Sequence, residues 1–224
     1  MPGTGRPIPV LHVHPTRYCY RGDADPSRPG GITEIYRDLA RDDDRTRQVT
    51  ADVIAALSGG RNCLILTNWT SHLERIAALL RDAGDDPVVL RGGMGVKSRT
   101  AAQARLDRAL DGTPLLVAGT GPYVGEGFDC PPLDTLFLAA PVASKGKLVQ
   151  HVGRILRPHP GKTTAEVHDY HDQHTGVLAA AITRRAPGYI SLGFPDPRRI
   201  ALTPSAMPAS GVNRSLNSQT PQRI

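Results

Sequence analysis

The sequence predicts a single α/β domain whose mostly parallel sheet is covered by helices on both faces. From residue 62 onward, short apolar runs alternate with segments that carry apolar residues at helical spacing. Such alternation is typical of βα crossovers. A chain of 224 residues can hold one domain of ordinary size together with a tail. No stretch approaches 18 consecutive apolar residues, so no membrane-spanning helix is predicted.

One strand and two helices are predicted before residue 60. Residues 1–9 are rich in Pro and Gly and lack the apolar core of a signal peptide, so we expect a flexible N-terminus. Residues 10–13 alternate in polarity and indicate a short edge strand. Residues 32–41 and 45–57 carry apolar side chains at helical spacing. Ser58-Gly59-Gly60 then provides a typical helix stop.

Strands and helices alternate through the rest of the folded part. The predicted strands are residues 62–67, 88–90, 114–118, 134–139 and 164–169, and the predicted helices are residues 71–82, 97–110, 149–157 and 173–184. After residue 195 the pattern gives way to Pro, Ser, Asn and Arg with few large apolar residues. We therefore expect a folded domain over residues 10–195 and a disordered basic tail over residues 196–224.

Charge and cysteine content set broad limits on function. The formal net charge is +6, and half of it lies in residues 196–224, which hold four Arg and one Asp. The positive charge of the folded part is therefore mild and favours a nucleic-acid partner only weakly. Cys19, Cys63 and Cys130 are odd in number and far apart. We interpret them as reduced thiols of a cytoplasmic protein.

The helix over residues 149–157 has one apolar side and one basic side. Gln150, Arg154 and Arg157 fall within about 60° of one another at 100° per residue, and Gly153 lies beside them. The other side carries Val149, Val152, Ile155 and Leu156. Pro158 is expected to stop the helix just after Arg157. Two guanidiniums one turn apart suit a multi-oxygen anion such as a triphosphate, although an amphipathic helix with a solvated basic face is the alternative.

Polar and glycine-rich segments follow several of the predicted strands. In parallel sheets, ligands bind at the loops that leave the carboxyl ends of the strands. The segments in question are Thr67-Asn68-Trp69, Arg91-Gly92-Gly93, Gly119-Thr120-Gly121 and Gly125-Glu126-Gly127-Phe128-Asp129. Glycine amides can approach a phosphate or a sugar closely, and Asp129 can accept a hydrogen bond from a ribose hydroxyl. Glycine-rich loops are also common in α/β proteins without such a ligand.

The order and spacing of these segments resemble motifs of superfamily 2 helicases. The segments Val117–Thr120, Glu126–Asp129, Leu133–Leu138 and Gln150–Arg157 resemble the fifth and sixth motifs, and residues 64–80 resemble the fourth. The resemblance covers residues 10–195 and is strongest to DEAD/DEAH-type helicases and translocases of bacterial restriction and conflict systems. Their later signatures match Asp169-Tyr170…Asp172 and Arg184-Arg185…Tyr189…Gly193-Phe194.

This resemblance implies a RecA-like domain with two groups of site residues. Arg157 would act as the arginine finger on the γ-phosphate of ATP, with Arg154 beside it, while Gln150, Gly153, Gly127 and Asp129 would face the nucleotide. The expected nucleic-acid side consists of Thr67, Asn68, Trp69, Arg91, Gly92, Gly93 and Thr120. Trp69 would stack on a base, or would be a partly buried aromatic at a helix start. DNA is the expected partner before RNA.

The sequence lacks the parts of such a motor that grip phosphate and magnesium. Gly161-Lys162-Thr163 imitates the end of a P-loop, but Leu156 stands where the first glycine belongs, so we predict a turn. None of the four Glu residues follows an Asp. We therefore expect the second motor domain of a helicase, sharing ATP and Mg²⁺ with a P-loop domain on a separate chain. The alternative is a non-catalytic remnant that binds nucleic acid or protein.

Three histidines close to the end of the last predicted strand raise the question of a metal site. His168, His171 and His174 recur at intervals of three, which would bring them together on a helix. This segment begins in a strand and continues into a loop, and no Cys is nearby. No metal site is predicted.

Overall fold

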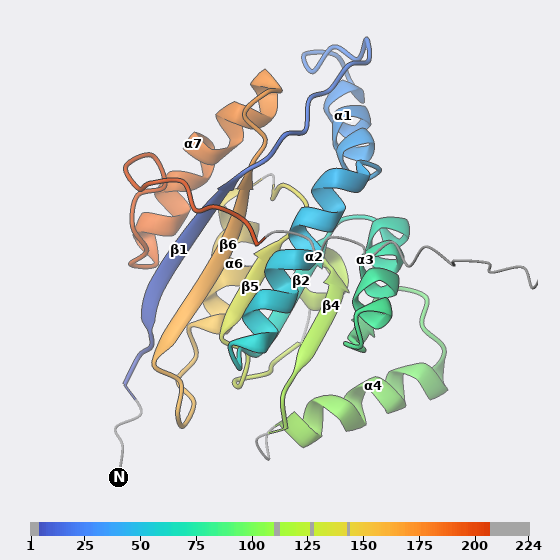
Figure 1. Ribbon diagram of the computed structural model, residues 1–224, viewed down its shortest axis with the longest axis vertical. Coiled ribbons are helices and arrows are strands. Elements are labelled where there is room, and N and C mark those ends of the chain that lie inside the picture. The colour runs from blue at the N-terminus through green and yellow to red at the C-terminus, as the bar shows by residue number, and fades with distance from the viewer. Residues whose placement is uncertain (1–4, 110–112, 126–127, 143, 207–224) are drawn as a thin grey trace, which may run out of the picture.

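A computed structural model describes residues 5–109, 113–125, 128–142 and 144–206. Its centre is a six-stranded sheet in the order β1-β6-β5-β2-β4-β3, in which every pairing is parallel (Figure 1). The strands are β1 (Ile8–Pro15), β2 (Cys63–Thr67), β3 (Val88–Leu90), β4 (Leu116–Thr120), β5 (Thr135–Leu138) and β6 (Thr164–His171). The predicted α/β fold with a parallel sheet is confirmed.

Helices cover both faces of this sheet. They are α1 (Gly31–Leu39), α2 (Asp43–Ser58), α3 (Thr70–Asp82), α4 (Val96–Ala109), α5 (Gly121–Gly125), α6 (Lys145–Ile155) and α7 (Gly176–Ser191). Apolar residues of α4, α5, α6 and α7 pack on one face, and those of α2 and α3 pack on the other. In Figure 1, α2 and α3 lie in front of the sheet. The core therefore has two apolar layers separated by the strands.

Strand β4 lies further along the chain than predicted and contains a glycine with little room for a side chain. The prediction ended the strand at Ala118, whereas Thr120 still pairs with Thr67 of β2. A Cβ added at Gly119 would lie 2.5 Å from Val124 of the short helix α5 and 3.1 Å from the Leu90 carbonyl oxygen. Gly119 thus allows α5, which the sequence did not predict, to pack directly against the strand end.

Two boundaries of the predicted domain are corrected. Strand β1 begins at Ile8, inside the segment expected to be flexible. The chain beyond residue 195 continues in contact with the fold, because the Thr203 amide donates to the Val13 carbonyl oxygen at 2.7 Å and the Ala206 amide donates to Asp52 Oδ1 at 2.6 Å. Disorder from residue 196 onward was therefore wrong for residues 196–206. Residues 207–224 lie outside the described part.

The residues that match the later helicase signatures form buried ion pairs. Arg185 donates to both Asp169 oxygens at 2.8 and 2.9 Å, and the Tyr189 hydroxyl donates to the same carboxylate at 2.8 Å. Arg45 donates through Nε to Asp172 at 2.7 Å. Each buried charge is paired and hydrogen-bonded, which burial of charge requires. These residues therefore join α7 and α2 to the end of β6.

No helix in the described ranges is long and apolar enough to span a membrane.

Candidate functional site

Three of the segments predicted to carry the site leave the same edge of the sheet. All strands run in the same direction, so their carboxyl ends share one edge. Thr67 and Thr120 are register partners at the ends of β2 and β4, and Leu90 at the end of β3 pairs with Gly119. The loops after these three strands are therefore neighbours, as a ligand site at this edge needs.

Two of the three charged groups predicted to face the nucleotide form an ion pair with each other. Arg157 Nη1 donates to Asp129 Oδ2, and both side chains are about half exposed. The Arg154 guanidinium lies over the Phe128 ring, 5.8 Å from its centroid. Burial, together with the charge of Arg157, lowers the pKa of Arg154, yet a guanidinium stays charged at any ordinary pH. Two cations and one carboxylate thus gather between α6 and the loop before β5.

Arg157 does not lie on the helix, which corrects the helical projection. Helix α6 ends at Ile155 and Leu156 is its C-cap, so Arg157 occupies the loop that follows. Pro158 accounts for this because a proline disfavours helical backbone at the residue before it. Gln150 is exposed, and a Cβ at Gly153 would meet nothing within 4 Å. Gln150 on α6 is therefore exposed, while Arg157 is positioned by a turn.

The turn after Arg157 is built around Lys162. Its ammonium group donates to the carbonyl oxygens of Pro131, Leu133 and Arg157 at 3.1, 2.5 and 3.0 Å. Burial lowers the pKa of Lys162 to about 8. Gly161 has φ 80°, the left-handed conformation that glycine tolerates. The prediction of a turn rather than a P-loop is confirmed, and this lysine fixes the backbone beside Arg157.

An open cleft of about 710 Å³ lies next to these residues. Three of the residues predicted to contact nucleic acid, Asn68, Gly92 and Thr120, line it. The cleft is completed by side chains of α4, α5 and the following loop that the sequence analysis did not single out, namely Arg99, Gln103, Tyr123 and Phe128. The lack of a strong apolar stripe on α4 was the available signal for its polar, site-facing side.

The other residues predicted to contact nucleic acid do not line this cleft. Thr67 is 1% exposed, and its Oγ1 lies 2.9 Å from His72 Nδ1, so its side chain cannot reach a ligand. Trp69 is half-buried at the N-cap of α3. Arg91 Nε lies 3.6 Å from Glu74 Oε1, and Gly93 is exposed with φ 75°. The Thr67 hydroxyl therefore serves internal packing, and a nucleic-acid contact at Thr67 stays a prediction that needs its backbone.

Gly127 lies outside the described residues. Its predicted place on the nucleotide side therefore remains a prediction. The described neighbours Phe128 and Asp129 both reach the arginines of the following segment.

His151 connects the arginine-bearing helix to the cleft, and the sequence analysis assigned it no role. Its Nε2 would lie 3.7 Å from a Cβ at Gly121, and Asn68 Oδ1 would lie 3.6 Å from the same point. Burial lowers the pKa of His151 to about 4, so its imidazole is neutral at neutral pH. The signal was its position in the Gln150–Arg157 segment, directly after the residue expected to sense the nucleotide.

Comparison with known proteins identifies the fold. No protein-family model matches the sequence. A curated relative, transcript termination protein A18 of fowlpox virus (strain NVSL), is 28% identical over 132 residues, which is 58% of this chain. The chain spans only 28% of that protein's length.

Solved helicase-type structures share the fold at low sequence identity. Bacteriophage T4 UvsW has a TM-score of 0.59 and 15% identity, with 88% of this chain and 41% of that chain covered. The Escherichia coli DEAD-box protein SrmB, bound to the regulator of ribonuclease activity A, has a TM-score of 0.53 and 14% identity, with 82% and 86% covered. Saccharomyces cerevisiae Dbp5, bound to RNA and ADP BeF3, has a TM-score of 0.52 and 12% identity, with 89% and 41% covered. The chain therefore has the fold of the C-terminal RecA-like domain of superfamily 2 helicases.

Proposed function

We propose that this chain is the second motor domain of an ATP-dependent superfamily 2 helicase or translocase. In this role it supplies Arg157 and Arg154 to ATP and Mg²⁺ that are held by a P-loop domain on another chain. It also supplies part of the nucleic-acid track, for which DNA is our first candidate. The observation that carries the proposal is the gathering of Arg154, Arg157 and Asp129 beside Phe128, which lines the cleft.

The chemistry asked of these arginines is charge stabilisation. Phosphoryl transfer develops negative charge on the transferred group, and a planar guanidinium can bind two of its oxygens at once. Arg157 is half exposed, so it can exchange its intramolecular partner Asp129 for a phosphate. Asp129 would then be released toward the ribose. Gln150 is exposed on the side of α6 that carries Arg154, and its amide can contact a bound nucleotide.

The nucleic-acid side of the proposal rests on the cleft. The cleft lining includes Gly92, the Asn68 side-chain amide and the Arg99 guanidinium, together with the aromatic ring of Tyr123. Phosphates are bound by such amides and cations, and bases stack on aromatic rings. Phe128 contributes to the cleft and also contacts Arg154. One side chain therefore links the proposed track to the proposed ATP site.

The decisive experiment compares Arg157 variants in the reconstituted pair of motor domains. Loss of an arginine finger typically reduces the rate of hydrolysis roughly 10³–10⁵-fold. We expect Arg157→Ala to lose activity on this scale, and Arg157→Lys to restore little because a point charge on a flexible stem does not reproduce the planar fork. Affinity for a DNA strand should change far less. ATPase assays and fluorescence anisotropy measure the two effects.

Arg37→Ala on the exposed surface of α1 is the matched control and should leave both readings unchanged. If Arg157→Ala weakens strand binding but spares hydrolysis, Arg157 contacts nucleic acid instead. If no P-loop domain activates the chain, the alternative of a non-catalytic binding remnant takes the place of the motor proposal.

A further inference from the structure

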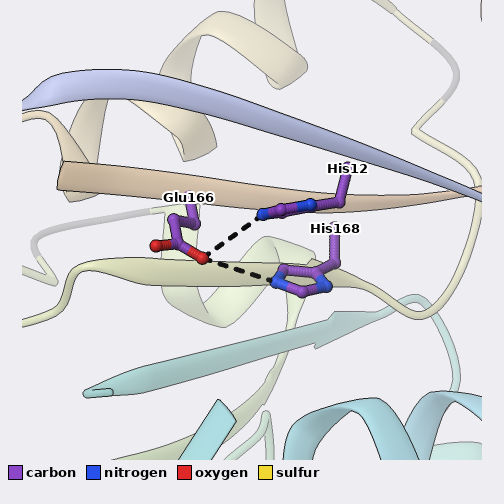
Figure 2. A group of neighbouring side chains, drawn as sticks. All are labelled: His12, Glu166 and His168. Carbon is purple, nitrogen blue, oxygen red and sulfur yellow. Dashed lines mark ion pairs between the residues drawn. The ribbon is translucent and has the colours of Figure 1, made fainter. Parts of the chain in front are cut away.

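Two histidines and a glutamate meet on the α2 side of the sheet, away from the proposed ATP and nucleic-acid sites. His12 of β1 is the register partner of His168 of β6, and Glu166 precedes His168 by two residues on the same face. Their metal-ligating atoms all lie within 4.8 Å of one another. Figure 2 shows the Glu166 carboxylate directed toward both imidazole rings.

The same carboxylate oxygen of Glu166 faces both histidines. Glu166 Oε2 lies 3.3 Å from His12 Nε2 and 4.0 Å from His168 Nε2. The second distance is too long for a hydrogen bond. His168 Nε2 is buried, and within the described residues it has no hydrogen-bond partner. A buried polar atom without a partner costs free energy, so a ligand bound at His168 Nε2 would stabilise the fold.

The contacts of His168 are compatible with the tautomer in which Nε2 faces the cluster as a lone pair. His168 Nδ1 lies 2.9 Å from His14 Nε2, and His14 Nδ1 lies 3.2 Å from Ser205 Oγ and 3.7 Å from Asp52 Oδ2. If His14 donates from Nδ1 toward Ser205 and Asp52, its Nε2 accepts the proton of His168 Nδ1. Metal-binding histidines usually donate their other ring nitrogen in this way, and the ring orientation is thereby fixed.

Packing and charge also suit a bound cation. Phe137 stacks on the His168 ring at a centroid distance of 4.3 Å and holds the imidazole in place. Arg61 contacts the other oxygen of Glu166, with Nη1 3.3 Å from Oε1, so it does not occupy the oxygen that faces the histidines. The His12 and Glu166 side chains are 28% and 23% exposed, which leaves a path for entry.

We propose that His12, Glu166 and His168 form a site for a single divalent transition-metal ion, with Zn²⁺ as the representative. Two imidazole nitrogens and one carboxylate oxygen match its ligand preference, and water completes a tetrahedron. Bond lengths near 2.1 Å place tetrahedral ligands roughly 3.4 Å apart, so small side-chain movements close the site. The ion links β1 to β6 at the edge of the sheet and so stabilises the pairing of two distant chain segments.

The test measures Zn²⁺ binding by the whole chain, free of any affinity tag, in a Cys19→Ser background because Cys19 is an exposed thiol. We expect one ion per chain by isothermal titration, removal by chelator, and a thermal midpoint that rises with Zn²⁺ concentration. Co²⁺ should give the intense visible bands of a tetrahedral site. His14→Gln should weaken binding roughly 10–100-fold, and His12→Ala or Glu166→Gln should weaken it further.

His171→Ala is the matched control, because His171 lies on β6 but on the opposite face of the strand. It should bind Zn²⁺ as the parent does. Thermal unfolding without metal identifies any variant that fails to fold, and Glu166→Gln, which keeps the side-chain shape, then decides. Absence of stoichiometric Zn²⁺ binding by the parent chain overturns the proposal. Unchanged binding in both the Glu166→Gln variant and the His12→Ala variant also overturns it. An equal loss of binding in the control variant His171→Ala does so too.

Discussion

His72 of α3 is a buried histidine whose ring joins two hydroxyl groups. Its Nδ1 lies 2.9 Å from Thr67 Oγ1, and its Nε2 lies 3.4 Å from Thr46 Oγ1. Burial, assisted by the charges of Arg45 and Arg75, lowers the pKa of His72 to about 3. The neutral ring therefore couples α2, α3 and the end of β2, and this coupling occupies the Thr67 hydroxyl.

Acidification should destabilise the domain through His72. The unfolded imidazole takes up a proton near pH 6.5, whereas the folded one does so only near pH 3, so the contribution to stability is complete above 6.5 and is lost as pH falls toward 3. His72→Gln should lower the free energy of unfolding by about 1–2 kcal/mol at neutral pH and flatten its dependence on pH. Urea unfolding at several pH values between about 4.5 and 7.5 measures both effects. The exposed control His174→Gln should keep the parental slope; an unchanged slope in His72→Gln contradicts the assignment.

At the scale of elements, the segment over residues 196–206 holds the edge of the sheet. The Ala206 amide donates to Asp52, the Thr203 amide donates to Val13 of β1, and Gln48 Nε2 donates to Ser205 Oγ at 2.6 Å. Asp52 also accepts from the Tyr170 hydroxyl at 3.1 Å. The segment thus closes a polar network between β1, α2 and β6.

Truncation distinguishes this segment from the rest of the C-terminal region. Ending the chain after residue 195 should lower the free energy of unfolding by about 2–4 kcal/mol, because several hydrogen bonds and a buried carboxylate lose partners. Ending it after residue 206 should leave stability unchanged. Denaturant titrations of the two truncated chains against the full chain provide the measurement. Equal stability of the chain ending at 195 would show that the contacts are energetically neutral.

The interiors of these elements were predictable, whereas some ends were not. Apolar runs identified β2, β3 and β5, because burial on both faces leaves a strong signal in sequence. The shift of β4 depends on its pairing with β2 and on the room that Gly119 leaves for α5, which are non-local facts. Residues 196–206 were missed because backbone and polar contacts, rather than apolar burial, attach them.

The candidate site was predictable to the level of its segments. Helicase-like motifs brought Arg157 and Asp129 to the same place, and the structure joins them although they are 28 residues apart. The cleft residues Arg99 and Tyr123 escaped notice, since their segments carry no such motif. The proposed metal site was not predicted, because His12 and Glu166 belong to strands far apart in sequence and only the β1–β6 register brings them together.

At the scale of the whole molecule, the isolated chain should have no measurable ATPase activity. The sequence contains neither a P-loop nor an Asp-Glu pair, so nothing in it grips the phosphates and Mg²⁺ as phosphoryl transfer requires. A coupled ATPase assay, with and without DNA, checks this expectation. Turnover above background that Arg157→Ala abolishes would contradict it.

Nucleic-acid binding by the isolated chain should be weak and sensitive to salt. The net charge of +6 is modest, and few cations line the cleft, so few counterions are released on binding. Arg99→Ala should weaken binding about threefold to tenfold and reduce the dependence on salt, whereas Arg37→Ala should change neither. Fluorescence anisotropy with single-stranded DNA and RNA at several salt concentrations tests both statements. Equal weakening by both variants would place the contact outside the cleft.

The parallel pairing of β1 with β6 has a consequence for biosynthesis. Ile8 pairs with Thr164, so β1 leaves the ribosome and waits for a partner made about 150 residues later. At 5–20 residues per second, that wait lasts roughly 8–30 s. During this time β2, β4 and β3 can assemble with their helices while β1 stays an unpaired strand. The nascent chain therefore adds its first strand last, and the period before that step is when chaperones have access to it.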